Sequence, residues 1–170
     1  TSWSGNPAVG DSITLSALLN NNILKTVKYW AVAETGGAAT ALLVLGDSTQ
    51  IALNNGILIT STDGTTRTYT GKNANDYANG EFNRNETAPN IAVNLNACIN
   101  HANGHYGKIT ATQVSNEITL TQDVSGPNGN TTIITSASGG ATGWGTSTIP
   151  SAFTDGSVVT GVEESSDGSK

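Results

Sequence analysis

A single stretch of the sequence, residues 87–103, carries the periodicity of an amphipathic helix. Thr87 can cap this helix, and Pro89 suits its first turn because no backbone N–H partner is needed there. Asn103-Gly104 predicts a left-handed stop after it. Four apolar residues recur at spacings of four, three and four, as one helix face requires: Ile91, Leu95, Cys98 and Ala102.

Strand patterns precede the predicted helix. Residues 50–53 and 57–60 are apolar runs on either side of Asn54-Asn55-Gly56. Because Asn and Gly tolerate the positive φ of a tight turn, we expect a β-hairpin here. Asp63-Gly64 is a second turn signal, and residues 65–70 alternate β-favouring residues after it. The segments predict a meander of antiparallel strands.

Strand patterns also follow the helix. Residues 108–114 and 117–122 alternate around the tight turn Ser115-Asn116, and residues 131–136 complete the pattern. The order of three strands, one helix and three strands predicts an α+β, β-rich fold. In this fold the helix covers an antiparallel sheet of hairpins.

The N-terminal part has weaker patterns. Residues 12–24 allow either a short helix or an irregular strand. Residues 25–34 and 39–45 flank Thr35-Gly36-Gly37 and resemble a further hairpin.

We expect three parts along the chain. Residues 1–48 form an irregular N-terminal arm with this possible hairpin, because the first ten residues hold little to bury except Trp3. Residues 49–136 form the α+β core. Residues 137–170 form a Gly/Ser/Thr-rich C-terminal extension whose acidic end is solvated.

The segment 71–86 is a long loop rich in Asn and Gly. Its roughly 16 residues exceed the usual length of a connection, so we expect a contact or functional loop. Tyr77 within it is the leading candidate for an exposed contact. Because aromatic residues anchor many protein interfaces, the interface candidates are aromatic: Trp3, Tyr77, Phe82 and Trp144. Six aromatic residues could instead form a stacking platform for a carbohydrate: Trp3, Trp30, Trp144, Tyr69, Tyr77 and Tyr106.

Composition excludes several functional classes. The chain has 170 residues, a net charge of −6 and seven basic residues, so it lacks the positive footprint of a nucleic-acid binder. No apolar run approaches the roughly 18 residues of a membrane span. The first residues also lack the basic region and apolar core of a signal peptide. Thr, Ser, Asn and Gly make up 80 of the 170 residues, which suits a weakly charged protein that persists outside cells.

The sequence assigns no catalytic residue, metal ligand or cofactor. His101 and His105 have the spacing of two ligands on one helix face, but Gly104 is expected to break that face. Cys98 could be a nucleophile, yet its place on the apolar stripe favours core packing. Asp-Gly pairs leave a weak surface calcium site open. Six carboxylates could pair as glycosidase acids, although most occupy turn positions: Asp47, Asp63, Asp76, Glu81, Glu86 and Asp123.

Several segments in a fixed order resemble a known module. They are Asp63–Thr70, Asn96–His101, Ile109-Thr-Ala-Thr, Ile118–Gln122 and Gly126–Ile133. Together they resemble a small α+β module that recurs in virion structural proteins of tailed bacteriophages, especially marine and cyanobacterial phages. The resemblance covers about residues 50–136. It implies a role in the particle and carries over no functional residue.

We therefore expect a non-enzymatic virion structural protein located on the capsid surface rather than the tail. It would decorate the capsid by protein–protein docking in many copies. Its partners would be the major capsid protein or other virion proteins, and the chain would form homo-oligomers, with no nucleic acid or membrane partner. The alternative is a glycan- or receptor-binding module of a phage tail or fibre, or of a bacterial surface adhesin.

Overall fold

The structure is a computed structural model that describes residues 12–18, 22, 24–30, 36–136 and 144–158. The chain divides into two compact units: residues 1–35 with 159–170, and Gly36–Val158. The fold is α+β and strand-rich, as the sequence predicts. The described residues contain nine strands and one α-helix. The first ten residues, with Trp3, and the acidic C-terminal end lie outside the described residues.

In the smaller unit, β1 (Ser12–Leu18) pairs with β2 (Leu24–Trp30) as an antiparallel hairpin. Of the two alternatives for residues 12–24, the strand is the one found. The predicted hairpin between residues 25–34 and 39–45 is wrong, because β2 pairs with β1 whereas β3 (Thr40–Val44) pairs with β8 in the larger unit. The reason is burial: every second residue around β3 is needed in the core of the larger unit.

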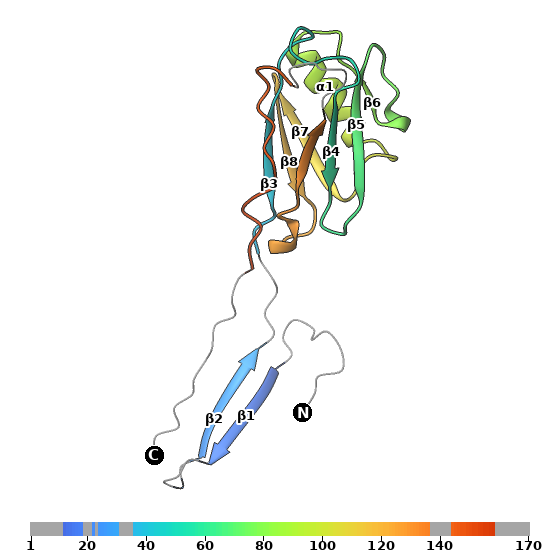
Figure 1. Ribbon diagram of the computed structural model, residues 1–170. Helices are drawn as coiled ribbons and strands as arrows, with labels where there is room; N and C mark the ends of the chain where they lie inside the picture. The colour runs from blue at the N-terminus through green and yellow to red at the C-terminus, as the bar shows by residue number, and fades with distance from the viewer. Residues whose placement is uncertain (1–11, 19–21, 23, 31–35, 137–143, 159–170) are drawn as a thin grey trace. The chain divides into compact units, whose positions relative to one another are not determined.

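The larger unit has two sheets. One has the strand order β3-β8-β7, with β8 at Glu117–Gln122 and β7 at Ile109–Val114. The other has the order β6-β5-β4-β9, with β6 at Glu81–Asn83, β5 at Thr66–Lys72, β4 at Gly56–Thr60 and β9 at Ile133–Ser136. Figure 1 shows β3, β8 and β7 side by side, with β4, β5 and β6 beside one another in the second sheet.

The core is formed by the apolar faces of both sheets. Alternate residues are buried along the strands of the larger unit except β9, which buries only Ile133, as expected for strands with one face toward the core. Leu43 on β3, Ile118 on β8, Ile57 on β4 and Tyr69 on β5 all have no exposed surface and belong to one hydrophobic cluster. This cluster holds the two sheets and the helix together.

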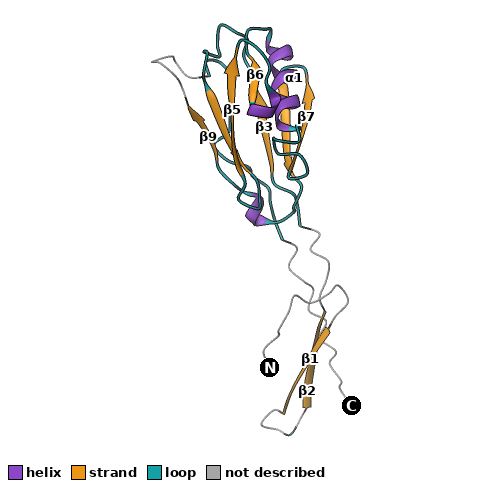
Figure 2. Cartoon of the chain, turned by 90° about the vertical axis from the view of Figure 1, so that its right-hand side faces the viewer, coloured by secondary structure: helices purple, strands orange, loops and turns teal. Residues whose placement is uncertain are grey.

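The helix α1 (Ala88–Ile99) packs chiefly against β6 and β7, the outer strands of the two sheets (Figure 2). Its buried face contains Ile91, Leu95 and Cys98, as the apolar stripe predicts. The helix therefore closes one side between the sheets rather than covering the middle of a single sheet.

The helix ends earlier than the predicted residue 103. The expected left-handed stop at Asn103-Gly104 is wrong, since neither residue has a positive φ. Gly104 is instead needed for a close approach, because a Cβ there would lie 2.4 Å from the Cys98 carbonyl oxygen. The His105 N–H then donates to the Ile99 carbonyl at 2.7 Å. Local contacts between residues six apart in the chain, rather than a residue with a positive φ, therefore follow the end of the helix.

The predicted hairpin between residues 50–53 and 57–60 is also wrong. Asn54 does adopt a positive φ of 66°, but residues 50–53 form no strand. They cannot pair with β4, because β5 and β9 already occupy both of its edges. Ile51 is buried in the core, and its carbonyl accepts a hydrogen bond from the Arg84 guanidinium at 3.0 Å.

The segment 71–86 is more ordered than a simple loop. It contains a 3₁₀ turn, η1 (Tyr77–Asn79), followed by β6, which pairs with β5 in parallel. Gly80 allows this arrangement: its φ is 75°, and a Cβ there would lie 2.8 Å from the Thr68 carbonyl oxygen. The sheet therefore includes one parallel pair in addition to the predicted antiparallel pairs.

The larger unit extends beyond the predicted core of residues 49–136. At the N-terminal side it includes β3, and at the C-terminal side it includes residues 144–158. The second segment follows a second 3₁₀ turn, η2 (Pro127–Gly129), and β9 in the chain. It contributes Phe153, with 1% of its surface exposed, to the core.

Candidate functional site

Cys98 lies in the core with no exposed surface. Burial raises the pKa of its thiol to about 12, so the thiolate needed by a nucleophile is disfavoured. The prediction that Cys98 packs as a small hydrophobe is confirmed.

His105 is buried and belongs to a hydrogen-bonded pair with Tyr69. Its Nε2 lies 3.3 Å from the Thr65 carbonyl oxygen, which can only accept, so we infer that Nε2 carries the proton. Nδ1 then accepts from the Tyr69 hydroxyl at 2.7 Å. Burial lowers the pKa of His105 and raises that of Tyr69. His101 is partly exposed, and its ring packs near Tyr77 with 6.5 Å between centroids.

Three of the six candidate carboxylates, Asp47, Asp63 and Asp76, are held by turn residues or by a lysine. Asp47 accepts from the backbone and hydroxyl of Thr49, and Asp76 caps η1. Asp63 lies 2.7 Å from the Lys108 ammonium, which holds the pKa of that carboxyl well below its usual range. These roles agree with the turn positions inferred from the sequence. Among the described residues, no three His, Cys, Asp or Glu side chains gather as a metal site would require.

The interface candidates have different positions in the structure. Phe82 and Trp144 are buried, with 0% and 6% of their surfaces exposed, and their rings stack with centroids 6.3 Å apart. As exposed anchors these two predictions are wrong, because both rings fill the core. Tyr77 is half-buried against the core, and Trp3 lies outside the described residues.

The edges of the two sheets are covered by other parts of the same unit. Along β3, the segment 144–158 forms two pairs of backbone hydrogen bonds, Val44 with Thr148 and Thr40 with Thr154. Ser151 accepts from the first residue of β9 at 2.8 Å. These contacts occupy backbone groups that an added strand would use.

Asparagine side chains cover the other two edges. Asn100 bonds both backbone groups of Ala111 on β7, donating to its carbonyl at 2.8 Å and accepting from its N–H at 3.1 Å. On β6, the Asn83 N–H donates to the Asn75 side chain at 2.6 Å, and its carbonyl accepts from the Asn94 side chain at 3.1 Å. These side-chain amides thus form the hydrogen bonds that the backbone of a neighbouring strand would otherwise form.

The hairpin of the smaller unit differs in this respect. Within the part of the chain that the structure describes, β1 and β2 pair with each other and with no further strand. The register sets Ile13 opposite Tyr29 and Leu15 opposite Val27. Each strand of the hairpin therefore keeps one outer edge of backbone N–H and C=O groups.

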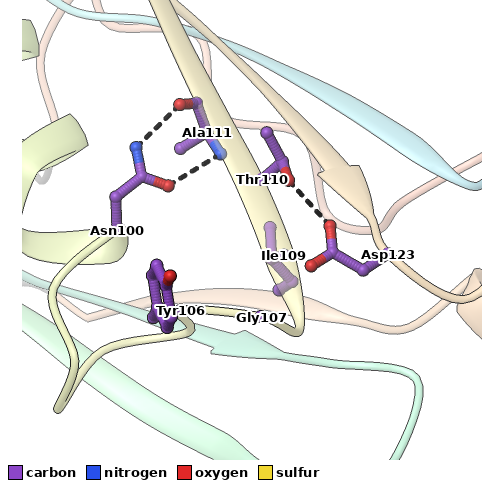
Figure 3. A pocket seen from close by; sticks show the side chains of 7 residues that line it. All are labelled: Asn100, Tyr106, Gly107, Ile109, Thr110, Ala111 and Asp123. Carbon is purple, nitrogen blue, oxygen red and sulfur yellow. Dashed lines mark hydrogen bonds between the residues drawn. The ribbon is translucent and has the colours of Figure 1, made fainter.

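A hollow of about 490 Å³ lies at the start of β7, with Asn100 and Tyr106 on one side of the strand and Asp123 on the other (Figure 3). Its rim contains the Tyr106 ring, of which 73% is exposed, and the exposed Asp123 carboxylate. The Thr110 hydroxyl donates to Asp123 at 2.8 Å. The complete lining is Asn100, Tyr106, Gly107, Ile109, Thr110, Ala111 and Asp123. The sequence suggested Tyr106 and Asp123 separately, one as an aromatic platform and one as a carboxylate, but gave no sign that they share a site.

No helix among the described residues is long and apolar enough to cross a membrane. Comparison of the chain with protein-family models, with curated proteins and with solved structures finds no match.

Proposed function

We propose that this chain is a non-enzymatic structural protein of a tailed-bacteriophage virion. In this proposal it decorates the capsid surface in many copies, and its partners are the major capsid protein and further copies of itself. The resemblance of residues 50–136 to modules of virion proteins supports a role in the virus particle. The hairpin formed by β1 and β2 supports docking to a neighbouring protein.

The hairpin is the observation that carries the proposal. An isolated two-stranded hairpin is at best marginally stable in water, because it has no further strand or layer to complete it. In the larger unit, covered edges discourage strand addition. No described strand pairs with the outer edges of β1 and β2, and an added strand from a neighbouring protein would satisfy them with main-chain hydrogen bonds.

The distribution of charge is compatible with docking to an acidic neighbour. Residues 12–30 contain Lys25 and Lys28 and no acidic residue, within a chain whose net charge is −6. Such charge complementarity between neighbouring copies would increase the rate of association more than the affinity.

Quantitative mass spectrometry of purified particles from the source tests the proposal. A copy number close to that of the major shell protein, or a simple fraction of it, is the expected result. A few copies to a few dozen per particle would contradict capsid decoration and favour the alternative, a receptor-binding module of the tail or fibres. Absence from particles would overturn the virion role and leave a surface adhesin as the working model.

A further inference from the structure

Tyr106 occupies an unusual position among the aromatic residues. Tyr69 and Phe82 are fully buried in the core, and Trp144 and Phe153 are nearly so. Tyr106 has 73% of its surface exposed, and it forms no ring contact or hydrogen bond with any described residue. Its ring therefore contributes little to the stability of the unit, although it stands at the rim of the hollow beside β7 (Figure 3).

The polar groups of the hollow offer hydrogen-bond acceptors to a ligand. One oxygen of the Asp123 carboxylate accepts from Thr110, and the other makes no hydrogen bond to a described residue. The Thr110 hydroxyl donates its proton to Asp123 and keeps lone pairs that can accept. These acceptors and the exposed ring line the same hollow, and the space at Gly107 is open, since a Cβ there would meet no atom within 4 Å.

The wall of the hollow is already fixed in this structure. The two hydrogen bonds between Asn100 and the backbone of Ala111 tie the segment after α1 to β7 (Figure 3). A ligand entering the hollow would therefore not have to order this wall, although it would have to fix the exposed Tyr106 ring. The same two bonds occupy the β7 edge at Ala111, which disfavours an extended peptide as the occupant.

The charge of the lining excludes one class of ligand. The lining has one carboxylate and no Lys, Arg or His, so an anionic ligand would be repelled. The nearby Lys108 ammonium is engaged by Asp63 at 2.7 Å. The volume of about 490 Å³ lies within the roughly 300–1,000 Å³ of ordinary small-molecule sites.

We propose that this hollow binds a neutral carbohydrate. The C–H face of a sugar ring stacks on Tyr106, as apolar faces do on aromatic rings, while the sugar hydroxyls donate to Asp123 and Thr110. This binding is separate from the proposed role in the particle, and the isolated chain in solution suffices to test it.

The test is an NMR titration of the full chain with a panel of neutral sugars: glucose, galactose, mannose, N-acetylglucosamine and their β-linked disaccharides. We expect at least one to shift the amide signals of Gly107 and Thr110 in a saturable way. Tyr106→Ala should weaken that binding by about tenfold or more, whereas Tyr106→Phe, which keeps the ring, should stay within about twofold of the original chain.

Val114→Ala is the matched control, because Val114 is 75% exposed on β7 and does not line the hollow. It should bind as the original chain does. The proposal is overturned if no sugar of the panel shifts these amides, if Tyr106→Ala binds normally, or if a sialic acid binds more tightly than every neutral sugar.

Discussion

At the residue scale, His105 links burial to the pH dependence of stability. It has no exposed surface, and its neutral form is held between Tyr69 and the Thr65 carbonyl. Burial lowers the pKa of His105 below its ordinary value of 6.5. The unfolded chain therefore takes up this proton at a higher pH than the folded protein. The contribution to stability is complete above about pH 6.5 and is lost as the pH falls through the lowered pKa.

We expect the free energy of unfolding to decrease as the pH is lowered from about 7.5 to about 4.5. His105→Gln should be less stable near neutral pH by about 1–3 kcal/mol, since it disturbs a buried hydrogen-bonded pair. The decrease toward low pH should be clearly smaller in this variant. Chemical denaturation at a series of pH values measures both effects.

His101→Gln is the control for the His105 experiment, because His101 is only partly buried. The free energy of unfolding of this variant should change with pH as that of the original chain does. If the free energy of unfolding changes with pH equally steeply in His105→Gln and in the original chain, His105 does not set the pH dependence. Asp63, whose pKa is lowered chiefly by Lys108, affects stability only in more acidic solution.

At the element scale, the asparagines have a structural use that composition alone does not show. Asn100 covers β7, and Asn75 and Asn94 cover β6. Asn116 donates to the Leu45 carbonyl just beyond β3 at 2.9 Å. A side-chain amide carries both a donor and an acceptor, so it can satisfy an edge without adding a strand. Four of the 19 asparagines thus satisfy backbone groups at or beside sheet edges of the larger unit.

Asn100→Ala should expose the backbone of Ala111. We expect a loss of about 1–3 kcal/mol in the free energy of unfolding, because two partly buried hydrogen bonds disappear. Hydrogen exchange of the Ala111 amide should accelerate more than that of other β7 amides. Denaturation and exchange measured by NMR provide the two readouts.

Asn90→Ala is the matched control, since the exposed Asn90 bonds only the Glu86 side chain at 3.1 Å. It should change stability by no more than about 0.5 kcal/mol. Unchanged exchange at Ala111 in Asn100→Ala would mean that the amide does not protect the edge.

At the scale of the whole molecule, the two units differ in whether each has a hydrophobic core of its own. Gly36–Val158 has one hydrophobic cluster and covered edges, so it satisfies the requirements of an independent domain. The hairpin of β1 and β2 is too small to form such a core. Folding is therefore expected to depend on the larger unit, and docking on the hairpin.

A truncated chain of residues 36–158 should fold cooperatively, with a Tm within about 2 °C of the full chain. It should fail to attach to particles that lack the protein, whereas the full chain attaches. Calorimetry and co-sedimentation with particles measure these outcomes. Loss of a cooperative transition would contradict the independence of this unit, and normal attachment would remove the hairpin from the docking model.

Much of the local structure was predictable from short segments. The apolar stripe from Ile91 to Cys98 predicted the helix face, and Asp63-Gly64 and Ser115-Asn116 predicted the tight turns that join β4 to β5 and β7 to β8. These signals act between residues close in the chain, through backbone φ and the period of the side chains. They determined the α+β class and most of the strands.

The pairing of strands distant in the chain, β3 with β8 and β4 with β9, was decided only by the tertiary structure. The Asn54-Asn55-Gly56 turn formed without a hairpin, because β5 and β9 took both edges of β4. Tyr106 and Asp123 share one hollow because they flank the predicted hairpin of β7 and β8, whereas Asn100 joins them only through its two hydrogen bonds to Ala111. Strand partners depend on burial summed over the entire unit. The sequence by itself thus determined the helix, most of the strands and the hairpins between neighbouring strands, and only the assembled core decided which strands distant in the chain meet.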